Sequence, residues 1–254
     1  MQEGGVLLQL KSHGEIKSSL VLGLDRVRSW RDTHRAFFDV IRADPRINTE
    51  CWGNEYIHNG YYPTPDAEAY AAMILENRPA RIVEVGSRFS ALIARKTVEK
   101  AGIATVIEVI DPSPRTEVRD VADRLILKHV EDTEMGAFDF TAGCILFIDS
   151  SHICRAGGDI PFLFCRVIPS LPAGVIVHVH DIFLPYDYPI AYQRRLYTEQ
   201  YVLHALLGDS ARYEILLATH YMSRTHPAEM QATFGSIVAR HDSYFGASFW
   251  FKTR

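Results

Sequence analysis

The stretch 80–92 constrains the fold more than any other part of the sequence, because it predicts a buried strand, a sharp turn and the start of a helix. Three β-branched apolar residues are typical of a strand covered on both faces: Ile82, Val83 and Val85. Gly86 lets the backbone pass close to a ligand, and a helix beginning near Ser90 would point its first amides at a negative group. Two interpretations stay open at this point: a site for a nucleotide-like ligand, or an ordinary strand-to-helix turn.

Strands and helices alternate along the rest of the chain. Further strands are predicted at 105–110, 125–129, 144–149, 175–180, 213–218 and 247–252. Helices are predicted at 90–101, 116–122, 160–168, 190–207 and 227–240. Strands separated by helical segments favour an α/β fold with a doubly wound, mostly parallel seven-stranded sheet that carries helices on both faces.

An N-terminal extension precedes this sheet. Apolar residues at helical spacing predict a helix over 20–43, and 51–65 is a loop rich in aromatic and amide side chains. We therefore expect a helical extension with its aromatic loop over 1–65 and a Rossmann-like domain over 66–254. The loop tyrosines could line a substrate pocket or fasten the extension to the main domain: Tyr56, Tyr61 and Tyr62. The N-terminal helices could also pair between two copies, as a homodimer.

Composition narrows the range of partners. The formal net charge of −4 argues against a general nucleic-acid binder, which would be basic. No apolar run approaches the ~20 residues of a membrane helix, and 1–5 lacks the basic start and apolar core of a signal peptide. The four cysteines show no metal-type pairing. We expect a cytoplasmic protein with a small-molecule substrate, without a nucleic-acid or membrane partner.

Polar residues cluster where the predicted strands stop. In an open α/β sheet, ligands bind outside the carboxyl ends of the strands, and these ends lie along one edge. The residues that follow successive strands are Gly86, Asp111, Glu131, Asp132, Asp149, His152, His180 and Asp181. This concentration is the strongest physical indication of a site in the chain.

The histidines and carboxylates after the fourth and fifth strands could hold a metal or move a proton. Asp149, His180 and Asp181 could converge on a divalent ion, and this donor set would suit Mn²⁺, Fe²⁺ or Zn²⁺ better than Mg²⁺. Alternatively, Asp149 meets a cofactor or backbone amides while His180 and Asp181 orient each other. His152 and His180 are candidate general bases, and either could instead cap a loop or hold a substrate hydroxyl. His178, one step deeper, is expected to be a core histidine.

Four segments together resemble a known family: 84–90 (Glu-Val-Gly-Ser-Arg-Phe-Ser), 110–112 (Ile-Asp-Pro), 146–152 (Leu-Phe-Ile-Asp-Ser-Ser-His) and 177–185 (Val-His-Val-His-Asp-Ile-Phe-Leu-Pro). The sequence resembles class I S-adenosylmethionine-dependent methyltransferases, and most closely a bacterial branch that acts on small molecules and saccharides. The resemblance covers roughly 54–201, including 66–68 and 199–201.

The resemblance implies roles for the matched positions. Glu84, Gly86 and Ser87 would flank the methionine part of the cofactor. Arg88 and Ser90 are further candidates for cofactor binding. Asp111 would accept hydrogen bonds from the ribose hydroxyls, Asp132 would lie near the adenine, and Asp149 would approach the methionine amino group or a metal. In metal-dependent O-methyltransferases of the catechol type, the ligands come from the ends of the fourth and fifth strands, where this chain has Asp149 and Asp181.

Two positions depart from the family pattern. His180 departs from the oxygen-rich ligand set, and Arg88 stands where the branch usually carries glycine. An arginine at that position could bind a carboxylate of the cofactor or of the substrate in a bidentate contact, or point to solvent.

The function that the resemblance implies is methyl transfer from S-adenosylmethionine to a hydroxyl of a natural product or saccharide, with His152, His180 and Asp181 as catalytic residues. One alternative displaces another group from the sulfonium, by aminocarboxypropyl transfer or cyclisation, and releases methylthioadenosine. The others are a metal-dependent oxygenase-like relative and a non-catalytic binding module.

Overall fold

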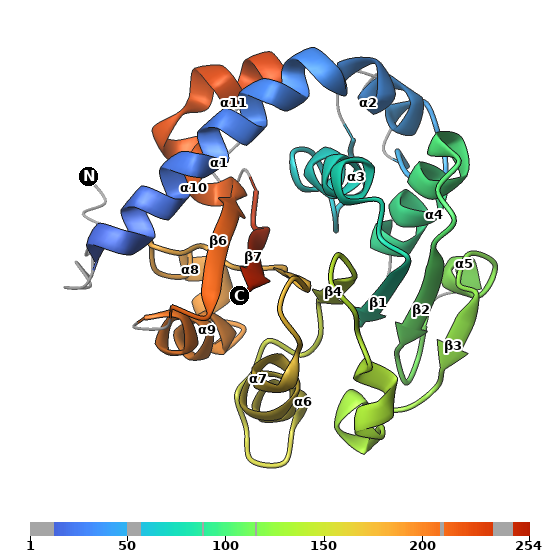
Figure 1. Ribbon diagram of the computed structural model, residues 1–254, viewed down its shortest axis with the longest axis vertical. Helices are drawn as coiled ribbons and strands as arrows, with labels where there is room; N and C mark the ends of the chain where they lie inside the picture. The colour runs from blue at the N-terminus through green and yellow to red at the C-terminus, as the bar shows by residue number, and fades with distance from the viewer. Residues whose placement is uncertain (1–12, 50–56, 88, 115, 209–210, 236–245) are drawn as a thin grey trace.

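The computed structural model describes residues 13–49, 57–87, 89–114, 116–208, 211–235 and 246–254. Its centre is a seven-stranded sheet with the order β3-β2-β1-β4-β5-β7-β6 (Figure 1). The strands are β1 Arg81–Val85, β2 Val106–Ile110, β3 Arg124–Ile126, β4 Ile145–Ile148, β5 Ile176–Val179, β6 Tyr213–Ala218 and β7 Phe249–Thr253. Only the pairings of β7 with β5 and β6 are antiparallel. The predicted α/β fold with a mostly parallel sheet of seven strands is confirmed.

The central strands are buried because helices cover both faces of the sheet. Every residue of β4 and β5 is buried, which explains why both strands are apolar, apart from His178 of β5, rather than alternating. One face is covered by α1 His13–Thr33, α2 Arg35–Arg42, α3 Asp66–Asn77, α4 Phe89–Ala101, α10 Thr219–Thr225 and α11 Pro227–Phe234 (Figure 1). The other is covered by α6 Asp159–Phe162, the π-helical turn Leu163–Val167, α7 Ile168–Ser170 and α9 Glu199–Leu207.

The remaining helical segments are short and lie in the connections. They are α5 Thr116–Arg119, the 3₁₀ turns Val130–Asp132 and Met135–Phe138, and α8 Ile190–Gln193.

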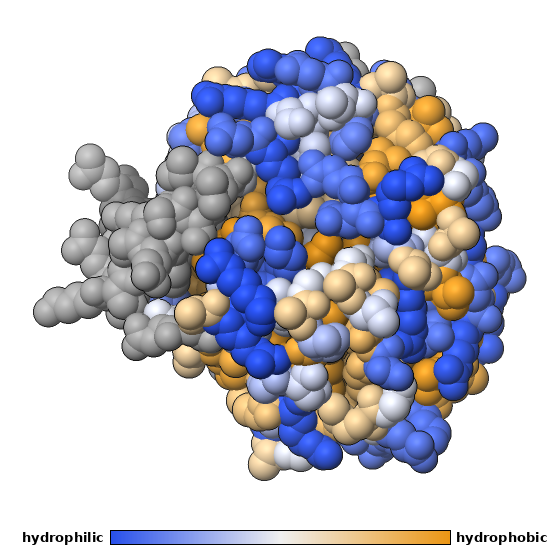
Figure 2. All heavy atoms as spheres, viewed as in Figure 1, coloured by the Kyte–Doolittle hydropathy of each residue, from blue (hydrophilic) through white to orange (hydrophobic). Residues whose placement is uncertain are grey.

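The N-terminal helices share a core with the sheet. Helix α1 packs against β6 and α11, and its Val27 and Trp30 belong to the same apolar cluster as Ile82 of β1. The division at residue 65 and the homodimer stay predictions. Hydrophilic and apolar side chains are interspersed over the described part of the face in Figure 2. Among the described residues, no helix combines the length and the apolarity that a membrane span requires.

Several predicted element boundaries are wrong. The helix predicted over 20–43 is two helices, interrupted at His34. The single helix predicted over 190–207 is also two, α8 and α9, because Leu196 adopts a left-handed backbone with φ +60°. Helix α10 was not predicted. Helix α11 ends at Phe234, so the remainder of the predicted 227–240 helix falls largely on residues outside those described.

The strand order places a crevice at the middle of the sheet. From β1 the chain winds outward to β2 and β3, and then crosses back so that β4 lies on the other side of β1. The crossovers on the two sides of this point leave from opposite faces, which opens a crevice outside the carboxyl ends of β1 and β4. Both strands end in residues that the sequence predicts for the site, Gly86 and Asp149.

Candidate functional site

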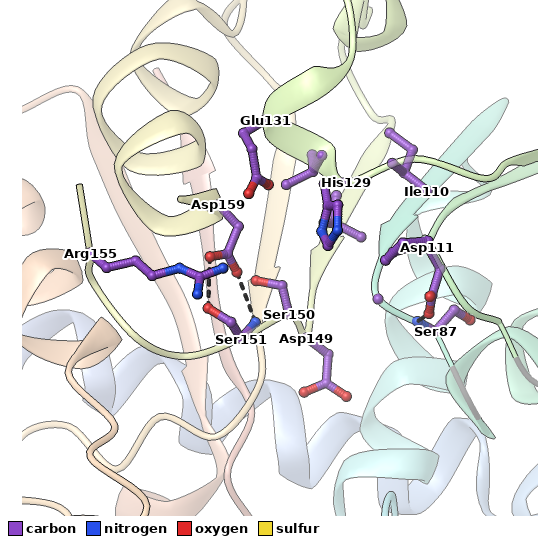
Figure 3. A pocket seen from close by; sticks show the side chains of 14 residues that line it. Ser87, Ile110, Asp111, His129, Glu131, Asp149, Ser150, Ser151, Arg155 and Asp159 are labelled. Carbon is purple, nitrogen blue, oxygen red and sulfur yellow. Dashed lines mark hydrogen bonds between the residues drawn. The ribbon is translucent and has the colours of Figure 1, made fainter. Parts of the chain in front are cut away.

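A cavity of about 300 Å³ occupies this crevice. Its walls come from the ends of β1, β2 and β4 and from the segments after β3 and β4 (Figure 3). The lining residues that matter below are Gly86, Ser87, Asp111, His129, Glu131, Asp149, Ser151, Arg155 and Asp159. In Figure 3, Ser87 and Asp111 lie on one side of the pocket, and Ser151, Arg155 and Asp159 lie on the other. The volume falls in the range of small-ligand pockets.

Gly86 is required by the packing of two strand ends. Its φ is +70°, a conformation that side chains resist, and a Cβ built at this position would lie 2.1 Å from the carbonyl oxygen of Asp149. The amide of Asp149 in turn donates to the Val85 carbonyl at 2.9 Å. The predicted close approach at Gly86 is therefore to the β4 backbone.

Glu84 lies beneath this turn and does not line the pocket. It is fully buried, and its carboxylate accepts hydrogen bonds from the hydroxyls of Ser87 (2.7 Å), Ser90 (2.8 Å) and Tyr70 (2.8 Å). Burial raises the pKa of Glu84 to about 7, although these hydroxyl donors lower it. Glu84 and Ser90 thus hold the turn in shape, whereas the sequence predicted that both contact the cofactor.

Asp111 lines the pocket at the end of β2, as the sequence predicts. One carboxylate oxygen accepts from the amide of Ser87 at 3.2 Å and the other from the amide of Ser113 at 2.7 Å. These two amides fix the orientation of the carboxylate at the pocket wall. Each oxygen has a second lone pair that can accept a ligand hydroxyl.

The part of the cavity wall that follows β3 does not contain the predicted Asp132. Asp132 is exposed and is not among the lining residues, whereas His129 and Glu131 are. The strand ends at Ile126 and a 3₁₀ turn follows over Val130–Asp132, and this turn directs Glu131 rather than its neighbour inward. The predicted adenine contact of Asp132 is therefore not supported.

Asp159 at the start of α6 fixes the segment after β4. Its carboxylate accepts from the amide of Ser151 at 2.8 Å and from the Ser151 hydroxyl at 2.7 Å. Burial opposes ionisation, but these serine donors lower the pKa of Asp159. Arg155, on the same segment, also lines the cavity.

A cluster of charged side chains adjoins the cavity through Asp149. The Nε2 atom of His152 lies 3.3 Å from Oδ1 of Asp149 and 3.6 Å from Oδ2 of Asp181. The Nδ1 atom of His180 lies 3.4 Å from Asp149 and 3.8 Å from Asp181, so the two imidazoles flank the same pair of carboxylates. The structure thus brings all three predicted catalytic residues together.

Two further carboxylates close the cluster behind the imidazoles. Glu199, fully buried at the start of α9, lies 2.8 Å from Nδ1 of His152. Asp66, buried at the start of α3, lies 3.4 Å from Nε2 of His180. Each histidine is therefore bracketed by carboxylates on both ring nitrogens.

The backbone is strained at two residues of this cluster. His152 has φ +61° and Asp181 has φ +56°, and side chains other than glycine rarely adopt these values. Strain of this kind concentrates at functional sites, where surrounding contacts hold it in place. Here the backbone amides of Thr198 and Glu199 donate to the His152 carbonyl at 2.9 and 3.2 Å.

The charges in the cluster shift one another's pKa. Burial would raise the pKa of Asp149, but the charge of His180 and the hydrogen bond from His152 lower it below its usual range. Burial would lower the pKa of both histidines, yet their carboxylate neighbours raise it well above the usual value. Burial raises the pKa of Asp181. At neutral pH the imidazoles therefore carry the positive charge of the cluster.

The donor set fits a divalent cation. One atom from each of Asp149, His152 and Asp181 lies within 4.8 Å of the others. With Asp66 and Glu199 the cluster has four carboxylates against two imidazoles, so acidic groups outnumber basic ones. The sequence predicted His180 in place of His152. His180 contacts the same carboxylates, but its Nε2 faces Asp66 and its ring lies 4.9 Å from that of Tyr62.

His178 is a core histidine, as predicted. Its ring stacks on Trp250 at 3.7 Å between centroids, and its Nε2 lies 2.8 Å from the Ser248 hydroxyl. Burial lowers the pKa of His178 well below the usual value, so this ring is neutral.

The predicted substrate tyrosines have different environments. Tyr62 is buried among Tyr70, Phe147 and His180, which makes it a packing residue behind the cluster rather than an open pocket wall. Tyr61 is 48% exposed and stacks on Phe89 at 5.9 Å. The predictions for Tyr56 and Arg88 fall outside the described residues.

Comparisons with known proteins give weak matches. No protein-family model matches the chain. A curated protein of Archaeoglobus fulgidus, described as uncharacterized, is 36% identical over 101 residues, which is 37% of this chain and 45% of the relative. The chain thus spans less than half of that relative.

Solved structures of methyltransferases are similar at low identity. The O-methyltransferase TomG of Streptomyces achromogenes, involved in tomaymycin synthesis and in complex with SAM, is 12% identical, with 90% of this chain and 89% of that chain covered at TM-score 0.45. The SAH-bound methyltransferase PaMTH1 of Podospora anserina is 15% identical, with 98% and 99% covered at TM-score 0.44. The MycE methyltransferase of the mycinamycin pathway, in complex with Mg, SAH and mycinamycin VI, is 15% identical, with 73% and 48% covered at TM-score 0.39. At these values the assignment of a function depends on the geometry of the site itself.

Proposed function

We propose that this protein transfers a methyl group from S-adenosylmethionine to a hydroxyl of a small molecule. The observation that supports this function best is the position of Asp149, which lines the cavity and also contacts His152 and His180. A cofactor in the cavity and an acceptor at the imidazoles would therefore meet at one carboxylate. The family resemblance of the sequence implies the same cofactor.

The cavity has the groups that this cofactor requires. Asp111 can accept hydrogen bonds from ribose hydroxyls, because its oxygens are held at the wall by two backbone amides. Glu131 and His129, from the segment after β3, line the cavity in place of the predicted Asp132. Asp149 can accept from the methionine amino group. The sulfonium supplies the electrophilic methyl carbon, so the chain mainly positions the reactants.

His152 is the proposed proton acceptor for the attacking hydroxyl. Glu199 fixes its Nδ1 side, which leaves Nε2 directed at Asp149 and Asp181, next to the cavity. His180, bracketed by Asp66 and Asp149, holds the other side of the carboxylate pair.

We further propose that Asp149 and Asp181 hold a divalent ion together with one of the two imidazoles. Such an ion would supply the positive charge that the imidazolium groups supply now. With His180 as the imidazole ligand, His152 would be neutral and able to take a proton. A donor set that includes imidazole suits Mn²⁺, Fe²⁺ or Zn²⁺ better than Mg²⁺.

Calorimetry with S-adenosylmethionine, followed by mass spectrometry of the spent cofactor, tests the function. We expect saturable binding, and S-adenosylhomocysteine as the product once an acceptor is supplied. Methylthioadenosine would show that another group is displaced, and failure to bind the cofactor would refute the proposal. The cytoplasmic location, the homodimer and the absence of a nucleic-acid partner stay predictions from the sequence.

A further inference from the structure

The segment between β5 and α9 covers one side of the charged cluster. Its end is tied to the loop after β4, because Thr198 donates its amide to the carbonyl of His152 and accepts from the amide of Cys154 at 2.8 Å through its hydroxyl. This segment includes α8 and the left-handed residue Leu196, which is 71% exposed. These hydrogen bonds connect the segment directly to the loop that carries His152.

Two tyrosine rings of this segment face the cluster. The Tyr197 ring lies 4.5 Å from the imidazole of His152, and the Tyr192 ring lies 5.5 Å from that of Tyr197. Burial raises the pKa of Tyr192, and the charge of Asp181 and a hydrogen bond to it contribute in the same direction. The two rings thus form an apolar wall beside the proposed proton acceptor.

Arg195 lies above both rings. Its Cζ atom is 5.0 Å from the Tyr192 centroid and 5.9 Å from the Tyr197 centroid, which holds the guanidinium in a defined place although the residue is exposed. Among the described residues, no carboxylate lies within 4.0 Å of its nitrogens. Its neighbour Arg194 is also exposed and has no ring contact within the described part of the chain.

Because carboxylates outnumber the imidazoles in this cluster, a cation at its rim would favour the approach of an anion. A guanidinium supplies that cation in a planar form that matches a carboxylate or a phosphate with two parallel hydrogen bonds. The aromatic wall would hold the apolar part of the same molecule.

We propose that Arg195 binds an anionic group of the acceptor, so that the methylated molecule is a hydroxy compound that also carries a carboxylate or phosphate. This proposal rests on the proposed function, because the acceptor hydroxyl must reach His152 while the anion lies at Arg195. Arg195 is then the residue that selects the acceptor, and it takes no part in proton transfer.

Matched pairs of hydroxylated probes test the proposal: protocatechuate and catechol, glucuronate and glucose, ribose phosphate and ribose. Binding of each probe is measured by saturation-transfer NMR and calorimetry on the full chain, with and without S-adenosylhomocysteine. We expect the anionic member of at least one pair to bind at least about tenfold more tightly than the neutral member. The pair that shows the preference distinguishes a carboxylate from a phosphate.

Two variants test whether Arg195 causes the preference for the anionic probe. Arg195→Gln should abolish it, whereas Arg194→Gln should retain it. No binding of any probe, equal binding within every pair, or a preference that survives Arg195→Gln would each overturn the proposal. Calorimetry with S-adenosylmethionine on the same variants separates the two hypotheses, since Arg195 lies outside the cavity lining and should leave cofactor affinity unchanged.

Discussion

The Nδ1 atom of His152 lies 2.8 Å from Oε2 of Glu199, although the two residues are 47 positions apart in the sequence. Both side chains are buried, so the carboxylate fixes the imidazole without competition from water. When Nδ1 donates to Glu199, Nε2 faces Asp149 and Asp181. A proton acceptor needs this arrangement, and so does a metal-ligating histidine.

We therefore expect Glu199→Gln to lower kcat for methyl transfer about 10- to 100-fold. The affinity for S-adenosylmethionine should stay unchanged, because Glu199 does not line the cavity. Steady-state kinetics and calorimetry provide the two measurements. Glu214→Gln is the matched control, since Glu214 pairs with Lys252 and Arg254 at the far edge of the sheet. Wild-type kcat in the Glu199 variant would contradict the role given to this pair.

Asp111→Asn should weaken the binding of S-adenosylmethionine by about 1–3 kcal/mol, the contribution of hydrogen bonds to a charged acceptor. The amide side chain can keep one of the two backbone contacts that Asp111 makes, so the fold should persist. Calorimetry gives the dissociation constant. Asp132→Asn provides the comparison, because this exposed residue lies outside the cavity and should leave the affinity unchanged. Equal effects of the two substitutions would mean that the cofactor is not held at the end of β2.

Gly86→Ala should destabilise the protein more than Gly102→Ala does. Both glycines have positive φ, +70° and +59°, so each alanine incurs a backbone strain of about 1–2 kcal/mol. A methyl group at 86 also collides with the Asp149 carbonyl, whereas a Cβ at 102 meets nothing within 4 Å. Urea denaturation measures the difference between the two variants. Similar unfolding free energies would show that the strand ends separate easily, which would argue against a rigid cavity.

Glu84 should make stability depend on pH. Burial raises its folded pKa from 4.5 to about 7, so its contribution is fully present below pH 4.5 and is lost as the pH rises through about 7. The loss is on the order of 3 kcal/mol. In Glu84→Gln this loss is absent. The unfolding free energy of the wild type, relative to the variant, should therefore fall between these two pH values. Urea denaturation across this range checks the trend, and a constant difference would contradict it.

Chelation should show whether the proposed methyl transfer requires a divalent ion. If Asp149 and Asp181 hold a divalent ion, EDTA should abolish methyl transfer and Mn²⁺ should restore it, whereas cofactor binding to the Asp111 side of the cavity should persist. Turnover assays and calorimetry on the same chelated sample give both readings. Full activity after exhaustive chelation would refute the divalent ion.

The strands and the residues at their ends were predictable because they follow local rules. The run 145–148 is apolar throughout, as a strand buried on both faces must be, and Asp149 follows it directly. The strand order reverses between β1 and β4, and Gly86, Asp111 and Asp149 come together there because successive parallel strands end at one edge of the sheet. The core role of His178 follows from its position one step deeper in the sheet than His180.

The parts that sequence did not reveal depend on tertiary contacts. Glu199 and Asp66 lie at the starts of helices that are distant in sequence from the histidines they contact. A carboxylate at a helix start also has an ordinary explanation, because it interacts favourably with the helix dipole. The choice of Glu131 over Asp132 depends on a single 3₁₀ turn, which moves the inward position by one residue. The break at Leu196 requires a left-handed leucine, which has no signal in composition or periodicity.

Strand β7 lies between β5 and β6 although it follows both of them in the sequence. Until it emerges from the ribosome, the two strands that flank it expose unpaired edges that can recruit other chains. The residues just before it also donate the amides of Ala247 and Ser248 to Asp66, which faces His180. A nascent chain would therefore acquire the geometry of this cluster only after β7 has been made, and a product terminated before β7 would lack that geometry and be prone to aggregation.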